Sequence, residues 1–151
     1  MELTFKDAHW TDAEALIELY NAAFYDDYVK YGQCPGYGLS KYEMEVSILR
    51  FPKTMACLGD KIVGVVSGQM VDIGVFEIGA LCVHPDYQRK GIGKLLFEQY
   101  LTLCPNWKQI MLITPAGNSD AIRFYTEKCG MRVCGEELID TVTVVRLRKE
   151  Q

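Results

Sequence analysis

The sequence predicts a mixed α/β protein with a single domain over residues 1–151. Its length is that of one domain, because one hydrophobic core typically serves about 100–200 residues. Hydrophobic residues make up 49% of the chain and charged residues 24%, as in ordinary soluble globular proteins. Strand-like and helix-like segments follow one another along the chain without repeats or linkers. These observations together favour strands and helices that share one core.

The first segments are expected to be a strand and a helix. Leu3 and Phe5 alternate with polar neighbours, as in a short half-buried strand. Residues 11–14, Thr-Asp-Ala-Glu, have the form of a capping box, in which a hydroxyl and a carboxylate bond the free amides of a helix start. Apolar residues then recur at helical spacing as far as Phe24.

The stretch 25–40 is expected to be an irregular loop, because it holds four tyrosines, three glycines and Pro35. Residues 43–50 predict a second short helix that ends before Pro52. The remaining strands are expected at 54–58, 62–70, 75–83, 109–114, 131–134 and 141–147, and the remaining helices at 91–104 and 118–129.

Charge and cysteine usage limit the classes of partner. The net charge of −4 argues against a nucleic-acid partner, whose binding surface would be basic. No apolar run approaches the roughly 20 residues of a membrane span, so no membrane partner is expected. The six cysteines include no C-x-x-C pair, which argues against a zinc or redox site. Most of them lie among apolar residues, so buried reduced thiols and a cytoplasmic location are expected.

A strand-to-helix connection carries the clearest chemical signal. The strand predicted at 75–83 runs into a loop that contains Gly91 and Gly93 and leads directly into a helix. Glycines leave room for a ligand, and the free amides of a helix start attract anions. Two familiar phosphate loops are excluded. The Walker loop needs glycine at Gln88, and the dinucleotide fingerprint needs glycine at Leu96.

The segment 88–93, Gln-Arg-Lys-Gly-Ile-Gly, matches the (Q/R)-x-x-G-x-(G/A) signature of the GCN5-related N-acetyltransferase (GNAT) superfamily. Residues 81–87 resemble the lead-in to that signature, and residues 118–131 resemble the second motif of the family. The resemblance covers residues 61–131 well and the first sixty residues by element order alone. It implies a central, mostly antiparallel mixed sheet of about six to seven strands with about four helices.

The resemblance also implies which residues bind the co-substrate, acetyl-coenzyme A, with no metal. The backbone of the strand segment would pair with the pantetheine arm and polarise the thioester carbonyl, and the loop amides would hold the pyrophosphate. Asn118 would contact the pantetheine or the adjoining backbone. The full set implied is Leu81, Cys82, Val83, Gln88, Arg89, Lys90, Gly91, Ile92, Gly93, Lys94 and Asn118.

Two residues are expected to be catalytic. By resemblance, Tyr125 would protonate the departing thiolate. Glu77 lies eleven residues before Gln88, at the spacing of the glutamate base in the histone-acetyltransferase branch, and would take a proton from the amine. His84 and Cys82 are not expected to act in catalysis, because His84 lies at the strand end and the family transfers the acyl group directly.

Three activities remain open from the sequence. The first is acetyl transfer to a primary amine of a small molecule, the second is acetylation of a protein lysine or N-terminus, and the third is a non-catalytic acyl-CoA-binding module. The tyrosines and aspartates of 25–40 fall where the family places its acceptor-binding elements, and such groups suit a cationic amine. The alternative is a loop that only packs over the core. The identity of the acceptor, an acyl group other than acetyl, the identity of the general base, and a homodimer are left open.

Overall fold

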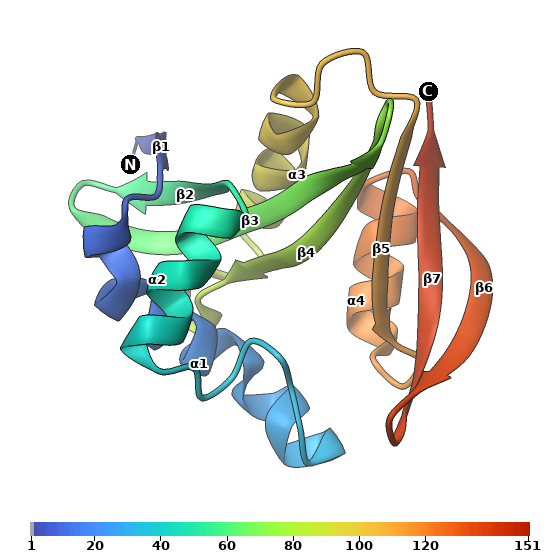
Figure 1. Ribbon diagram of the computed structural model, residues 1–151, viewed down its shortest axis with the longest axis horizontal. Coiled ribbons are helices and arrows are strands. Elements are labelled where there is room, and N and C mark those ends of the chain that lie inside the picture. The colour runs from blue at the N-terminus through green and yellow to red at the C-terminus, as the bar shows by residue number, and fades with distance from the viewer. Residues whose placement is uncertain (1) are drawn as a thin grey trace. The chain divides into compact units, whose positions relative to one another are not determined.

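Residues 2–151, which the computed structural model describes, form a mixed α/β fold with seven strands and four α-helices (Figure 1). The strand order is β1-β2-β3-β4-β5-β7-β6. β4 and β5 pair in parallel, whereas β1–β2, β2–β3, β5–β7 and β6–β7 pair antiparallel. The predicted class, a mostly antiparallel mixed sheet with helices, is confirmed.

The strands are β1 (Leu3–Asp7), β2 (Lys53–Leu58), β3 (Lys61–Asp72), β4 (Val75–Val83), β5 (Gln109–Pro115), β6 (Arg132–Ile139) and β7 (Val142–Glu150). The α-helices are α1 (Ala13–Tyr31), α2 (Lys41–Arg50), α3 (Ile92–Thr102) and α4 (Ser119–Arg123). Short helical turns are η1 (Trp10–Asp12), η2 (Pro85–Tyr87) and the π-helical η3 (Phe124–Lys128). None of the helices within residues 2–151 is long and apolar enough to cross a membrane.

The chain divides into two compact units. Unit 1 holds residues 2–68 and Ala80–Tyr100, and unit 2 holds Gln69–Gly79 and Leu101–Gln151. β3 and β4 contribute residues to both units.

Helices pack on both faces of the strands in unit 1. Tyr20 of α1 and Met44 of α2 belong to one buried cluster with Val65 of β3. On the other face, a Cβ added to Gly64 would lie 2.8 Å from the Leu96 side chain of α3. Because successive strand residues point to opposite faces, α1 and α2 lie against one face and α3 against the other.

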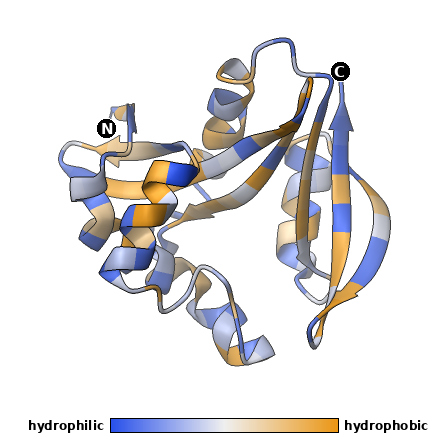
Figure 2. Ribbon diagram, in the orientation of Figure 1, coloured by the Kyte–Doolittle hydropathy of each residue, from blue (hydrophilic) through white to orange (hydrophobic). Residues whose placement is uncertain are grey.

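Unit 2 is built on the antiparallel strands β5, β7 and β6 with α4 and η3. The burial of β5 alternates, with Ile110, Leu112 and Thr114 buried. β7 buries Val144, Val145 and Leu147, and Figure 2 shows that hydrophobic and hydrophilic residues both occur along it. β6 is at the edge of the sheet and is largely exposed.

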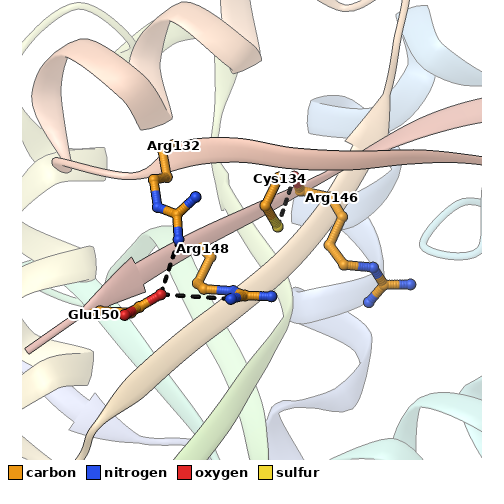
Figure 3. Close-up of polar contacts among 5 residues, drawn as sticks. All are labelled: Arg132, Cys134, Arg146, Arg148 and Glu150. Atoms are coloured by element: carbon orange, nitrogen blue, oxygen red, sulfur yellow. Dashed lines mark hydrogen bonds and ion pairs between the residues drawn. The ribbon is translucent and has the colours of Figure 1, made fainter.

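Polar contacts hold the edge strand β6 to β7 (Figure 3). Arg132 and Arg148 both contact Glu150 Oε1, at 3.0 and 3.5 Å, and the two guanidinium groups lower the pKa of that carboxyl. The Cys134 thiol donates to the Arg146 carbonyl at 3.5 Å, and the Arg146 guanidinium also pairs with Glu137. The strands predicted at 131–134 and 141–147 are therefore shorter than the observed β6 and β7. An exposed edge strand carries many charged residues, so a search for hydrophobic residues does not find its full length.

The start predicted for the first helix is wrong. The capping box lies two residues earlier and belongs to η1: the His9 amide donates to Asp12 Oδ2 at 2.8 Å, and His9 Nδ1 accepts from the Thr11 amide at 3.5 Å. α1 then begins at Ala13 without a side-chain cap. By contrast, the second helix begins at a full capping box between Ser40 and Glu43.

The loop predicted at 25–40 is also wrong for its first seven residues, which continue α1 to Tyr31. The helix ends at Gly32, which has a φ of 74° and donates its amide to the Tyr28 carbonyl at 2.8 Å. Tyrosines carry only a modest helix cost, so the glycine and not the aromatic content ends the helix.

Candidate active site

The connection from β4 to α3 is held by two side chains that follow the strand. His84 Nδ1 accepts the Asp86 amide at 3.1 Å and caps η2. Gln88 Nε2 donates to the Val83 carbonyl at 3.0 Å, which ties the loop to the end of the strand. His84 therefore has the strand-end role that the sequence indicates.

The loop that follows presents backbone rather than side chains. Gly91 has a φ of 82°, and a Cβ added there would meet nothing within 4 Å. Arg89 has a φ of 64°, a left-handed conformation that is uncommon outside glycine and occurs often at functional sites. The first amides of α3 have no carbonyl one turn earlier to bond, so they remain available to an anion.

Positive charge lies around this loop. Lys61 Nζ lies 5.1 Å and Lys90 Nζ 5.9 Å from the centre of the Tyr87 ring. Arg89 and Lys90 are exposed, whereas Lys94 pairs with Glu98 at 3.9 Å within α3. The loop therefore combines open amides, free space beside Gly91 and nearby cations, which suits a diphosphate.

The strand segment that precedes the loop is buried. Leu81 is half-buried, and Cys82 and Val83 are buried. Burial raises the pKa of the Cys82 thiol to about 12, because an apolar site disfavours the thiolate. A thiol that stays protonated at neutral pH is a poor nucleophile, which supports excluding Cys82 as a covalent acyl carrier.

The other predicted site residues belong to unit 2. Asn118 caps α4, with its Oδ1 accepting the Ala121 amide at 3.1 Å. Tyr125 is buried in the π-helical η3, and its carbonyl accepts the Met131 amide at 3.0 Å. Glu77 is half-buried on β4, where it pairs in register with Met111 of β5.

The structure thus collects the predicted residues in two groups. Residues 81–83 and 88–94 form one continuous strand–loop–helix segment in unit 1. Glu77, Asn118 and Tyr125 lie in unit 2. Their roles in binding and catalysis stay predictions.

Aromatic residues gather where α1 ends. The Tyr28 and Tyr37 rings are stacked, with centroids 4.3 Å apart, and Tyr25 lies 6.1 Å from Tyr37. Asn21 Oδ1 accepts the Gly38 amide at 2.9 Å, which folds the following loop back on the helix. Burial and, secondarily, the neighbouring Asp26 raise the pKa of Asp27.

Sequence reasoning missed three residues of unit 1. Gly64 lets α3 approach β3, and its only signal is a glycine inside an apolar strand pattern. Lys53 and Tyr20 are buried polar residues, at 5% and 4% exposure. No sequence pattern marks either residue as part of a polar cluster. A lysine at the start of a strand, in particular, is ordinarily solvent-exposed.

Comparison with models of known protein families identifies the family of this chain. The model of the acetyltransferase (GNAT) family matches residues 13–131. The chain belongs to this family. The match includes the β4–α3 loop in unit 1 and both Asn118 and Tyr125 in unit 2. A comparison with curated protein sequences finds no match.

Solved GNAT structures share the fold at low sequence identity. The PaiA N-acetyltransferase of Thermoplasma acidophilum, in complex with coenzyme A, matches with a TM-score of 0.83 and 19% identity over 100% of both chains. Ard1 of Thermoplasma volcanium has a TM-score of 0.80 and 17% identity over 99% of this chain and 98% of its own. The ribosomal-protein-S18-alanine N-acetyltransferase of Escherichia coli has a TM-score of 0.78 and 18% identity over 99% and 94%. The GNAT fold expected from the resemblance is confirmed.

Proposed function

We propose that this GNAT chain is an acetyl-CoA-dependent N-acetyltransferase, a single domain over residues 1–151, that acetylates a primary amine of a small molecule. The observation that carries the proposal is the connection from β4 to α3. There, Gly91 leaves the helix start open at a φ of 82° and exposed Arg89 and Lys90 flank it. The buried thiols of the chain support a reducing compartment, the cytoplasm, as its location.

The co-substrate binds along one continuous segment of unit 1. The amides of residues 88–94 hold the diphosphate, and the cations of the loop neutralise its charge. The backbone of residues 81–83 pairs with the pantetheine arm as an added strand would. An amide of this segment donates to the thioester carbonyl oxygen and stabilises the charge that develops on it. The family resemblance adds Asn118 to the residues that bind coenzyme A.

Two side chains move protons during the transfer. Acetyl-CoA, when bound, supplies an acyl group activated as a thioester. The amine nitrogen forms a bond to the acyl carbon as the carbon–sulfur bond breaks, and Glu77 accepts the proton that the amine loses. Tyr125 donates its phenolic proton to the departing sulfur. Holding the amine and thioester together in one complex supplies much of the rate enhancement.

The end of α1 favours a small acceptor over a peptide. The loop after Gly32 folds back so that Tyr37 stacks on Tyr28, which gathers aromatic rings at the end of α1. Aromatic rings beside the carboxylates of Asp26 and Asp27 attract a cationic amine.

The proposal is tested by following thiol release from acetyl-CoA with a panel of amines. The panel pairs amino acids with their decarboxylated amines and adds polyamines, aminoglycosides and peptides with free lysine or N-terminal amines. Turnover of a small amine supports the proposal, and turnover of peptides alone would replace it with protein acetylation. Coenzyme A binding by calorimetry without any turnover would instead point to a non-catalytic binding module.

A further inference from the structure

A buried lysine lies beneath α1 in unit 1 and is not explained by the proposed transfer. Lys53 opens β2, is only 5% exposed, and is in register with Ser67 of β3. Its Nζ donates to Ser67 Oγ at 2.9 Å and lies 5.8 Å from the centre of the Tyr20 ring. Three elements therefore enclose one ammonium group.

None of the titratable groups described around this ammonium is an anion. Burial lowers the pKa of Lys53 to about 8, and the neighbouring group that modifies it is the Cys82 thiol of β4. Burial raises the pKa of Cys82 to about 12 and also raises the pKa values of Tyr20 on α1 and of Cys34 in the loop after α1. The Tyr20 hydroxyl and the Cys82 thiol beside Lys53, and the Cys34 thiol near Cys82, are therefore neutral at pH 7, whereas Lys53 is still mostly protonated.

The same place holds unused hydrogen-bond donors. An ammonium has three N–H donors, and within residues 2–151 the structure gives Lys53 one acceptor, Ser67 Oγ. Tyr20, whose ring centre lies 5.8 Å from the ammonium, has a buried hydroxyl with no hydrogen-bond partner among the described residues. Buried donors without acceptors and a buried charge without a counter-ion both destabilise a fold. A ligand that brings a negative charge and oxygen acceptors would remove both costs.

We propose that Lys53 and Tyr20 form a subsite for the carboxylate of the acceptor, so that the substrate class is amino-acid-like: an amine that also carries a carboxylate. A carboxylate fits better than a phosphate, because one lysine and one neutral hydroxyl match a single charge and two oxygens. The link to an acceptor rests on the proposed acetyl transfer, whereas the binding of a carboxylate at Lys53 does not.

The test follows the ionisation of Lys53 itself. Protein with ¹³C-labelled lysine is titrated by NMR, with and without N-acetylglycine, the product that glycine would give. The control ligand is N-acetylglycinamide, which differs only in lacking the carboxylate. A bound carboxylate favours the ammonium, so we expect the Lys53 pKa to rise by about one pH unit with N-acetylglycine and to stay unchanged with the amide. Sodium acetate, as a third arm, shows whether a carboxylate suffices without the acetamido group.

Variants assign the effect to the two side chains. Lys53→Met removes the charge at nearly the same volume and should abolish N-acetylglycine binding measured by calorimetry. Tyr20→Phe removes only the hydroxyl and should weaken binding about 10–100-fold, the worth of one hydrogen bond to a charged group. Lys6→Met, which removes an exposed lysine of β1, should bind as the unaltered protein does.

Two results would overturn the inference: an unchanged Lys53 pKa at about 100 mM N-acetylglycine, far above a weak millimolar Kd, or an equal shift with the amide. If Lys53→Met does not fold, the lysine titration and Tyr20→Phe still decide it. Coenzyme A binding is measured on the same samples. Its absence would refute the proposed function and leave the carboxylate result to stand separately.

Discussion

The loop at the start of α3 and the enclosure around Lys53 are both suited to anions, but they are built in opposite ways. The loop uses backbone amides and an open glycine on the surface, with Gly91 at a φ of 82°. The enclosure uses side chains from α1, β2 and β3, and Lys53 is 5% exposed. A site made of backbone amides depends on the conformation of the backbone and tolerates most changes of side chain. A site made of side chains depends on the few polar atoms that those side chains carry. Each can therefore be broken by a different kind of substitution.

The largest effect is expected from removing the Tyr125 hydroxyl, which is proposed to donate a proton during the reaction. We expect Tyr125→Phe to lower kcat about ten- to a thousandfold, because the departing thiolate loses its proton donor, and to leave coenzyme A affinity nearly unchanged. Steady-state kinetics and calorimetry measure the two quantities. Tyr100→Phe, which alters another buried tyrosine, serves as the control. Unchanged turnover at saturating substrate would remove Tyr125 from the mechanism.

A change of backbone conformation should break the loop. Gly91→Val places a β-branched residue where φ is 82°, and we expect the Kd for coenzyme A to rise about 10–100-fold. The protein itself offers no obstacle to the new Cβ, so the effect comes from the conformation and from the ligand. Gly59→Val imposes similar strain in the turn between β2 and β3, where φ is 61°, and should leave the Kd unchanged. Equal affinity of both variants in calorimetry would contradict the assignment of the loop.

The burial of the Lys53 ammonium should change how the free energy of unfolding depends on pH. The pKa of Lys53 is about 8 in the fold and 10.5 ordinarily, so between these values the unfolded chain binds more protons and stability rises with pH. Below pH 8 the buried charge costs about 3 kcal/mol, because each pKa unit is worth about 1.4 kcal/mol. Lys53→Met should therefore raise the free energy of unfolding by about 2 kcal/mol at pH 7, with the gain lost near pH 10. Urea denaturation at both pH values measures this, and a gain that is the same at both would show that Lys53 does not titrate as described.

The smallest effect is expected where the two regions meet on β3. A Cβ at Gly64 would lie 2.8 Å from Leu96 Cδ1 and 3.1 Å from the Cys82 carbonyl oxygen. The leucine can turn away but the carbonyl is fixed in β4, so Gly64→Ala should lower stability by about 1–2 kcal/mol. Thermal unfolding measures the loss. A variant as stable as the parent protein would mean that α3 shifts freely on the sheet.

The contrast also explains what the sequence could predict. The β4–α3 segment follows from local rules: an apolar run, glycines, and a helix pattern over contiguous residues. Its residues are neighbours in the chain, so a short motif contains the whole loop. Tyr20, Lys53 and Ser67 come from three separate elements, and only the tertiary fold brings them together. Their spacing in the sequence contains no period or motif that could have revealed them.

Errors in the secondary structure have similar physical causes. The Thr-Asp-Ala-Glu segment satisfies the capping pattern, yet the chain places that box between His9 and Asp12 around an added turn. α1 runs seven residues further than its apolar pattern, to Gly32, where the backbone adopts the left-handed conformation. Both boundaries depend on local hydrogen-bond geometry, which hydrophobic spacing does not encode.

The π-helical η3 has a consequence for how this enzyme could be altered. A π turn accommodates one residue more than an α turn, and such turns are frequent at functional sites. Deleting one residue before Tyr125 would restore the ordinary pitch and rotate its phenol by about 100° around the helix axis. The direction in which the Tyr125 hydroxyl points would thus depend on the number of residues in this turn, independently of which amino acids surround it.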